Sequence, residues 1–182
     1  VIQVLAKRQP VATDLRYIIC IMKIASEFER IGDYASNISK RVIMLESNPF
    51  PQATGYVDEM ARICRNMINS ALEAFEILDE AKAIEVWHQD DQIDYKFVRF
   101  MNALKREMGE DTSLMEAYTS FIFVGRCCER IGDHITNIAE DIYYIPTVNT
   151  VPRPHTLGHG QKGAQEQLAG EGTVPSQLER GL

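Results

Sequence analysis

The stretch Glu29-Arg30-Ile31-Gly32-Asp33 occurs twice in this sequence, because Glu129-Arg130-Ile131-Gly132-Asp133 repeats it without change 100 positions later. The match continues in register at Asn37 and Asn137 and at Ile38 and Ile138. A repeated pentapeptide that is followed by a second match in register indicates an internal duplication. We therefore interpret the chain as two copies of one structural unit.

Both copies lie in segments whose apolar residues recur at alternating steps of three and four. Such a pattern predicts a helix packed in a bundle. In the first copy the apolar residues are Ile21, Ile24, Phe28, Ile31, Ala35, Ile38, Val42 and Leu45, and in the second they are Phe121, Val124, Cys128, Ile131, Ile135, Ile138, Ile142 and Ile145.

The polar residues of the repeat fall between these apolar positions, so we expect them on the outer face of each helix. They form two ladders with oxygen ligands at every fourth residue, namely Glu29, Asp33 and Asn37 in the first copy and Glu129, Asp133 and Asn137 in the second. Residues four apart on a helix have Cβ atoms about 5–6 Å apart. Two carboxylates at this spacing could share a hard cation.

The composition narrows the classes of partner. The 182 residues include 19 Lys and Arg and 26 Asp and Glu, which gives a net charge of −7. No basic block is present, so nucleic acid and anionic membrane surfaces are poor candidates. The longest apolar runs are too short to span a bilayer, so no membrane insertion is expected. The four cysteines show no C-x-x-C spacing and are expected to be buried or half-buried thiols in a reducing cytosol.

The pattern along the chain predicts an all-α fold without strands. We expect helices over about 11–46 and 54–78, then from Asp79 to Gly109, and from Ser113 until just before Pro146, with Thr54 and Asp79 as N-caps. The second copy has two helices before its motif helix, so the repeat predicts that about fifty residues of the first bundle are absent. The predicted organisation is the remainder of a first three-helix bundle at 1–46, a linker at 47–53, a complete second three-helix bundle at 54–145 and a disordered tail at 146–182.

A further acidic pair, Asp90 and Asp94, lies on the predicted middle helix of the second copy. Asp is a weak helix former, and neighbouring carboxylates repel each other, so a bound cation is a simple way to offset their cost. If the middle and motif helices are neighbours, one oxygen-rich site could form from Asp90, Asp94, Glu129, Asp133 and Asn137. Such ligands suit Mg²⁺, Mn²⁺ or Ca²⁺, and carboxylates also hold iron. The alternative is a solvated helix face with local arginine pairing, for which Arg126 is available to Glu129.

A metalloenzyme is the alternative from another functional class. Glu85-x-x-His88 has the spacing found in di-iron carboxylate bundles, but those sites need two such pairs and inward-facing carboxylates. We therefore favour a surface position for His88. No catalytic triad order, phosphate loop or activated cysteine setting is apparent, so no catalytic residue is predicted.

Three motifs together resemble the PhoU family of bacterial phosphate-signalling proteins. They are the repeated Glu-Arg-x-x-Asp-x-x-x-Asn ladder, the segment Arg8-Gln9-Pro10-Val11-Ala12-Thr13-Asp14-Leu15-Arg16, and Asp90-x-x-Ile93-Asp94. The resemblance covers Val1 to about Ile145. It implies tandem three-helix bundles that are often homodimeric and bind metal clusters on their surface.

The resemblance also implies a non-enzymatic function. The chain is expected to be a cytoplasmic negative regulator of phosphate uptake and of the phosphate-starvation response. It would act as an adaptor between the ATPase subunit of the phosphate ABC transporter and a membrane sensor histidine kinase. The implied ligands of a divalent or multinuclear metal (Mg, Mn or Fe) are Glu29, Asp33, Asn37, Asp90, Asp94, Glu129, Asp133 and Asn137. A carboxylate-bridged metalloenzyme and a purely structural scaffold remain as alternatives.

Overall fold

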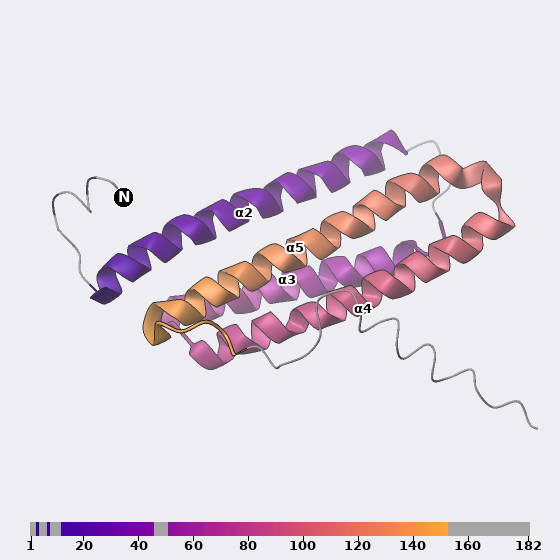
Figure 1. The fold of residues 1–182 in the computed structure, drawn as a ribbon. Coiled ribbons are helices and arrows are strands. Elements are labelled where there is room, and N and C mark those ends of the chain that lie inside the picture. The colour runs from indigo at the N-terminus through magenta and orange to yellow at the C-terminus, as the bar shows by residue number, and fades with distance from the viewer. Residues whose placement is uncertain (1–2, 4–6, 8–11, 46–50, 153–182) are drawn as a thin grey trace, which may run out of the picture. The chain divides into compact units, whose positions relative to one another are not determined.

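The computed structural model describes residues 3, 7, 12–45 and 51–152. Within these residues the structure contains four long α-helices, one short 3-10 helix and no strand, which confirms the predicted all-α class (Figure 1). The elements are α2 (Ala12–Met44), α3 (Thr54–Ile77), α4 (Glu80–Glu110), η1 (Thr112–Leu114) and α5 (Met115–Thr147). Across this part of the chain, no helix has the length and apolarity needed to cross a membrane.

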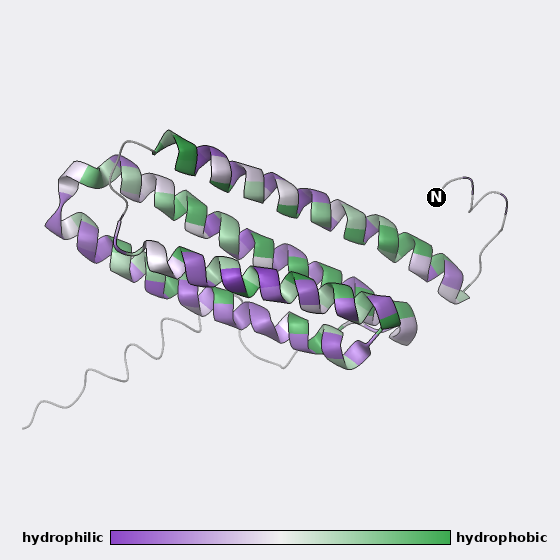
Figure 2. Ribbon diagram, turned by 180° about the vertical axis from the view of Figure 1, so that it is seen from behind, coloured by the Kyte–Doolittle hydropathy of each residue, from purple (hydrophilic) through white to green (hydrophobic). Residues whose placement is uncertain are grey.

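Helices α3, α4 and α5 follow one another through short connections and pack as an antiparallel three-helix bundle, and α2 lies along α5 (Figure 1). Helix α5 is therefore the central element, since it packs against each of the other three. Its eight predicted seam residues are all buried. Figure 2 shows hydrophilic and hydrophobic residues alternating along each helix, and the buried positions of the described residues are hydrophobic.

The first copy is less enclosed than the second. On α2, the seam residues Ile24 and Ile31 are buried against the core, whereas Ala35 and Val42 are exposed. The reason is that α2 packs mainly against α5 and is not surrounded by helices on several sides. The apolar period therefore predicts the helix correctly, but it overstates the burial of α2.

The helix ends confirm one predicted cap and correct two expectations. Asp79 caps α4, since its Oδ1 accepts a hydrogen bond of 3.0 Å from the backbone N–H of Lys82. Thr54 is not an N-cap, because Ala53 takes that place without a side-chain hydrogen bond. Gly109 does not end α4, which continues to Glu110. Asp111 then turns the chain into η1, since its Oδ1 accepts a hydrogen bond from the N–H of Ser113.

Helix α5 also continues past its predicted end, because it includes Pro146 and stops at Thr147. Pro146 has no N–H, so the carbonyl of Ile142 lacks its helical hydrogen bond, and only one more residue follows before the helix ends. The hydroxyl of Thr147 donates to the Tyr143 carbonyl at 2.7 Å, and the N–H of Val148 donates to the Tyr144 carbonyl at 3.0 Å. The predictions made for residues 8–11, 46–50 and 153–182 lie outside the described residues.

Candidate functional site

Four predicted ligands meet where α4 packs against α5, and we call them the acidic cluster: Asp90, Asp94, Glu129 and Asp133. Burial raises the pKa of Asp90 to about 7, and the nearby carboxylates of Asp94 and Asp133 add to this effect. Burial also raises the pKa of Glu129, with Asp94 and Asp133 contributing in the same direction. The prediction that Asp90 and Asp94 lie near the second ladder agrees with this arrangement.

Gly132 allows the close approach of the two helices. A Cβ atom at this residue would lie 2.5 Å from Oδ1 of Asp90 and 2.8 Å from Cδ1 of Ile93. The glycine of the repeated motif therefore makes room for an α4 carboxylate against the α5 backbone. Oδ1 of Asp90 is buried there and has no hydrogen-bond partner among the described residues. A buried polar oxygen without a partner is uncommon and costly, so it points to a missing proton or ligand.

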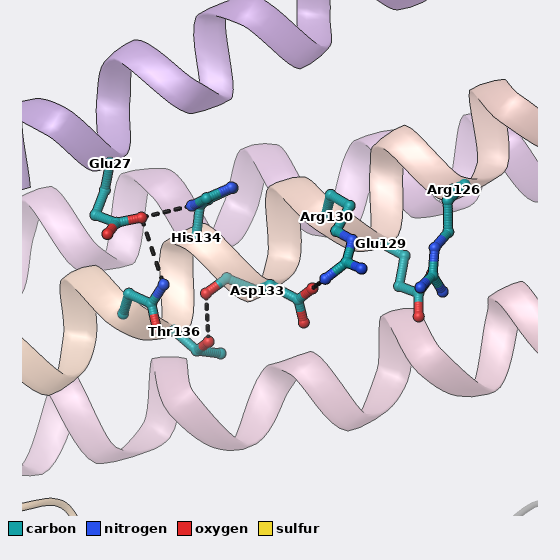
Figure 3. A network of polar contacts seen from close by, with 8 residues as sticks. Glu27, Arg126, Glu129, Arg130, Asp133, His134 and Thr136 are labelled. Atoms are coloured by element: carbon teal, nitrogen blue, oxygen red, sulfur yellow. Dashed lines mark hydrogen bonds and ion pairs between the residues drawn. The ribbon is translucent and has the colours of Figure 1, made fainter. Parts of the chain in front are cut away.

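Two arginines on α5 pair with the α5 members of the acidic cluster (Figure 3). Arg126 forms an ion pair with Glu129, and Nη1 of Arg130 lies 3.1 Å from Oδ2 of Asp133. The Glu129 side chain is only 18% exposed. Our expectation that the second ladder points freely outward is therefore wrong for Glu129, because α4 covers that side of α5.

The carboxylates of the acidic cluster do not form a complete metal coordination shell. Among the residues that the structure describes, no group of three or more His, Cys, Asp or Glu side chains is placed to hold a metal ion. The donor set is nevertheless all oxygen, which fits hard cations. Glu129 and Asp133 would have to turn from their arginines toward Asp90 to complete such a shell.

Asn137 lies apart from the acidic cluster and contacts Glu27 of α2. Its Nδ2 donates to Oε2 of Glu27 at 3.4 Å, and the same carboxylate oxygen lies 2.5 Å from Nδ1 of His134. Sequence reasoning missed Glu27 and His134. They are 107 positions apart, and only the packing of α2 on α5 brings them together.

The first ladder has different surroundings from the second. Glu29, Asp33 and Asn37 are exposed on α2. A Cβ atom at Gly32 would meet nothing within 4 Å, in contrast to Gly132. The structure therefore places two identical sequence motifs in two environments, and only the glycine of the second motif lies against a carboxylate of a neighbouring helix.

The two repeats meet with matching residues near each other. The rings of Tyr34 and His134, which are equivalent in the repeat, have centroids 5.5 Å apart. Lys23 Nζ lies 2.9 Å from Asp141 Oδ1, and the guanidinium of Arg41 lies 4.0 Å from the centre of the Phe123 ring. Position 23 is equivalent to 123 in the repeat, and position 41 to 141. The Lys23–Asp141 contact and the Arg41–Phe123 contact therefore lie at equivalent positions on the two sides of the interface. The motif helices α2 and α5 thus pack on each other with approximate two-fold symmetry.

Glu85, His88 and the cysteines, which have the chemistry that catalysis could use, lie in ordinary surface or core positions. Glu85 and His88 are both exposed, as expected for a surface position. All four cysteines are unpaired, and three of them are buried, which confirms the prediction of buried or half-buried thiols. Burial raises the pKa of Cys64 to about 12 and that of Cys128 to about 11, so neither is a ready thiolate nucleophile.

Comparison with known proteins gives a consistent result. The chain matches the PhoU domain family over residues 1–42 and 57–142. It is 36% identical over 143 residues to the "Phosphate-specific transport system accessory protein PhoU homolog" of Caulobacter vibrioides, and this match covers 78% of the chain and 62% of that relative. The homologue from Zymomonas mobilis, of the same name, is 33% identical over 94% of the chain and 69% of its own length.

Two solved structures are also similar. The crystal structure of PhoU from Pseudomonas aeruginosa matches with a TM-score of 0.76 and 36% identity, covering 79% of this chain and 69% of that one. The phosphate transport system regulatory protein PhoU from Streptococcus pneumoniae matches with a TM-score of 0.70 and 29% identity, covering 79% of this chain and 68% of that one.

Proposed function

Because the chain belongs to the PhoU domain family, we propose that it is an accessory protein of a phosphate-specific transport system that represses phosphate uptake and the phosphate-starvation response. The printed names of its relatives support this role, since they describe accessory and regulatory proteins of phosphate transport. The proposed partners are the ATPase subunit of a phosphate ABC transporter and a membrane sensor histidine kinase. The proposed setting is the cytoplasm, with the chain acting as a homodimer and without catalysis.

The acidic cluster is the proposed metal site. The observation that carries this proposal is the buried, unpartnered Oδ1 of Asp90, which faces a group of like charges. A divalent ion or a small Mg, Mn or Fe cluster would neutralise Asp90, Asp94, Glu129 and Asp133. Asn137 and the first ladder, Glu29, Asp33 and Asn37, remain predicted ligands that stand apart from this cluster.

A metal at this place would act by joining two helices. Asp90 and Asp94 belong to α4, whereas Glu129 and Asp133 belong to α5. A shared cation would replace repulsion between the two helices by attraction, and it would displace Arg126 and Arg130 from their carboxylates. We propose that metal loading thereby fixes the surface that the transporter and the kinase recognise. The metalloenzyme alternative receives no support from Glu85 and His88, since both are exposed.

The test is a phosphate-starvation reporter in a bacterium that lacks its own regulator of this response, grown in high phosphate. We expect the parent chain to repress the reporter and E129Q/D133N to lose repression at equal protein abundance. The matched control is E29Q/D33N, which makes the same changes in the exposed first motif and should repress more strongly than E129Q/D133N. A reporter that stays on with abundant parent protein would contradict the regulatory role. Full repression by E129Q/D133N would contradict the role of the metal site.

A further inference from the structure

A cleft of about 700 Å³ lies between α2 and α5, and its wall is rich in cations. Lys40 and Arg41 line it from α2, and Arg126 and Arg130 line it from α5. Among the residues that the structure describes, no aspartate or glutamate belongs to the lining. This is unexpected in a chain with a net charge of −7, in which acidic residues outnumber basic ones.

The charge balance of the cleft is positive. Arg126 and Arg130 pair with Glu129 and Asp133, and these carboxylates lie outside the lining. Within the described residues, Lys40 and Arg41 have no carboxylate partner, and the Arg41 guanidinium lies over the Phe123 ring at 4.0 Å from its centre. Four cations less two paired charges leave a net charge of about +2 at the wall, taking each pair as neutral.

The arginine side chains of the cleft can also exchange their present carboxylate partners for a bound anion. The side chains of Arg126 and Arg130 line the cleft, while their guanidinium groups are turned to neighbouring carboxylates on the same helix (Figure 3). Both arginines are about half exposed, at 48%. Ion pairs in which both groups are this exposed, as in Arg130 and Asp133, contribute roughly 0–1 kcal/mol, so a dianion in the cleft can compete for the Arg130 guanidinium.

We propose that this cleft binds a small phosphate-bearing dianion. Arginine presents paired N–H donors that match phosphate oxygens, and lysine is a compact charge that also binds phosphate. Asn37, which lines the same cleft, adds an amide donor. The volume falls in the range of small-molecule sites, about 300–1,000 Å³, and leaves room for more than one phosphate group or for an apolar part against Phe123. This site stands on residues of the cleft and does not depend on the metal proposal.

The test is isothermal titration calorimetry on the full chain after treatment with a chelator, with inorganic phosphate, pyrophosphate and AMP as separate probes. The test variant is K40Q/R41Q, which removes two cleft cations. The matched control is K105Q/R106Q, which removes the same charge from exposed positions of α4 outside the cleft. Circular dichroism and the melting temperature establish folding, and the single variant K40Q replaces K40Q/R41Q if the double variant does not fold.

We expect at least one probe to bind the parent and to bind K40Q/R41Q about tenfold or more weakly, because charged hydrogen bonds are lost. The control should stay within about twofold of the parent, since distant surface charges are screened. Absence of binding by all three probes up to roughly 10 mM would overturn the proposal, because weaker binding carries no specific site. Equal weakening in both double variants would also overturn it, because the effect would then be one of net charge.

Discussion

Gly32 and Gly132 occupy the same position of the repeated pentapeptide but have opposite surroundings, which gives a matched pair of substitutions. Gly132→Ala would place a Cβ atom 2.5 Å from Asp90 Oδ1. We expect it to lower the free energy of unfolding by about 1–3 kcal/mol, as overpacked sites do. Gly32→Ala meets open space on an α-helix, so it should raise the free energy of unfolding by up to about 1 kcal/mol.

Urea denaturation of the two variants and the parent measures both effects. The free energy of unfolding should fall for Gly132→Ala and rise for Gly32→Ala, although both substitutions replace the same glycine of the repeated motif. Equal effects would show that α4 does not pack against the second motif as the structure places it.

Asp90 should make stability depend on pH in the absence of metal. Its pKa rises from 3.8 to about 7 on folding, mainly through burial. The folded chain therefore holds this proton more tightly than the unfolded chain, so the free energy of unfolding falls as pH rises from about 4 to 7. Above about pH 7 the full cost of ionising Asp90 is present, and Asp90→Asn should remove roughly 1–3 kcal/mol of it.

The measurement is chemical denaturation of chelator-treated protein between pH 4 and 8. Asp91→Asn is the matched control, because Asp91 is the adjacent residue and is exposed. Asp90→Asn should flatten the pH dependence, and Asp91→Asn should leave most of it in place. If the curves of both variants run parallel to that of the parent, Asp90 is not the buried acid that the structure indicates.

At the scale of the helices, α2 and α5 should differ in local stability. All eight seam residues of α5 are buried, whereas α2 exposes large apolar residues such as Met22, Ile43 and Met44. A helix with few buried contacts opens more readily than the core does. We expect amide hydrogens of α2 to exchange with deuterium faster than those of α5 in a mass-spectrometric time course. Equal protection in the two helices would mean that α2 is held by contacts beyond those seen here.

The helices themselves could be predicted because their signals are local. The period of three and four residues indicated each helix, and the side chain of Asp79 indicated a start. The misplaced ends have local causes too: Pro146 is tolerated in the last turn, and Gly109 is followed by one more helical residue before Asp111 turns the chain.

Which helices pack against each face of α5 could not be predicted in the same way. The heptad placed Glu129 and Asn137 on an outer face, because it assumes one seam for each helix. In the structure α5 contacts helices on several sides, so Glu129 meets α4 and Asn137 meets Glu27 of α2. The apolar pattern of a helix indicates which residues are buried, but it does not indicate how many other helices pack against that helix.

At the scale of the whole chain, the proposed metal site and the proposed anion site both involve helix α5. The motif helices α2 and α5 pack on each other with approximate two-fold symmetry, and the cationic cleft opens between them. Arg126 and Arg130 belong to the wall of this cleft and also pair with the acidic cluster. A metal that claims Glu129 and Asp133 would release these arginines toward the cleft, and by linkage an anion in the cleft would favour metal binding.

A metal titration decides whether the acidic cluster of the second motif holds a metal ion, as we propose. Chelator-treated parent, E129Q/D133N and E29Q/D33N are titrated with Mn²⁺, and the bound ion is counted by electron paramagnetic resonance and calorimetry. We expect the parent and E29Q/D33N to bind Mn²⁺ tightly, and E129Q/D133N to lose about tenfold or more in affinity because two charged ligands are gone. Unchanged binding by E129Q/D133N, or no binding by the parent, would contradict the proposed metal site.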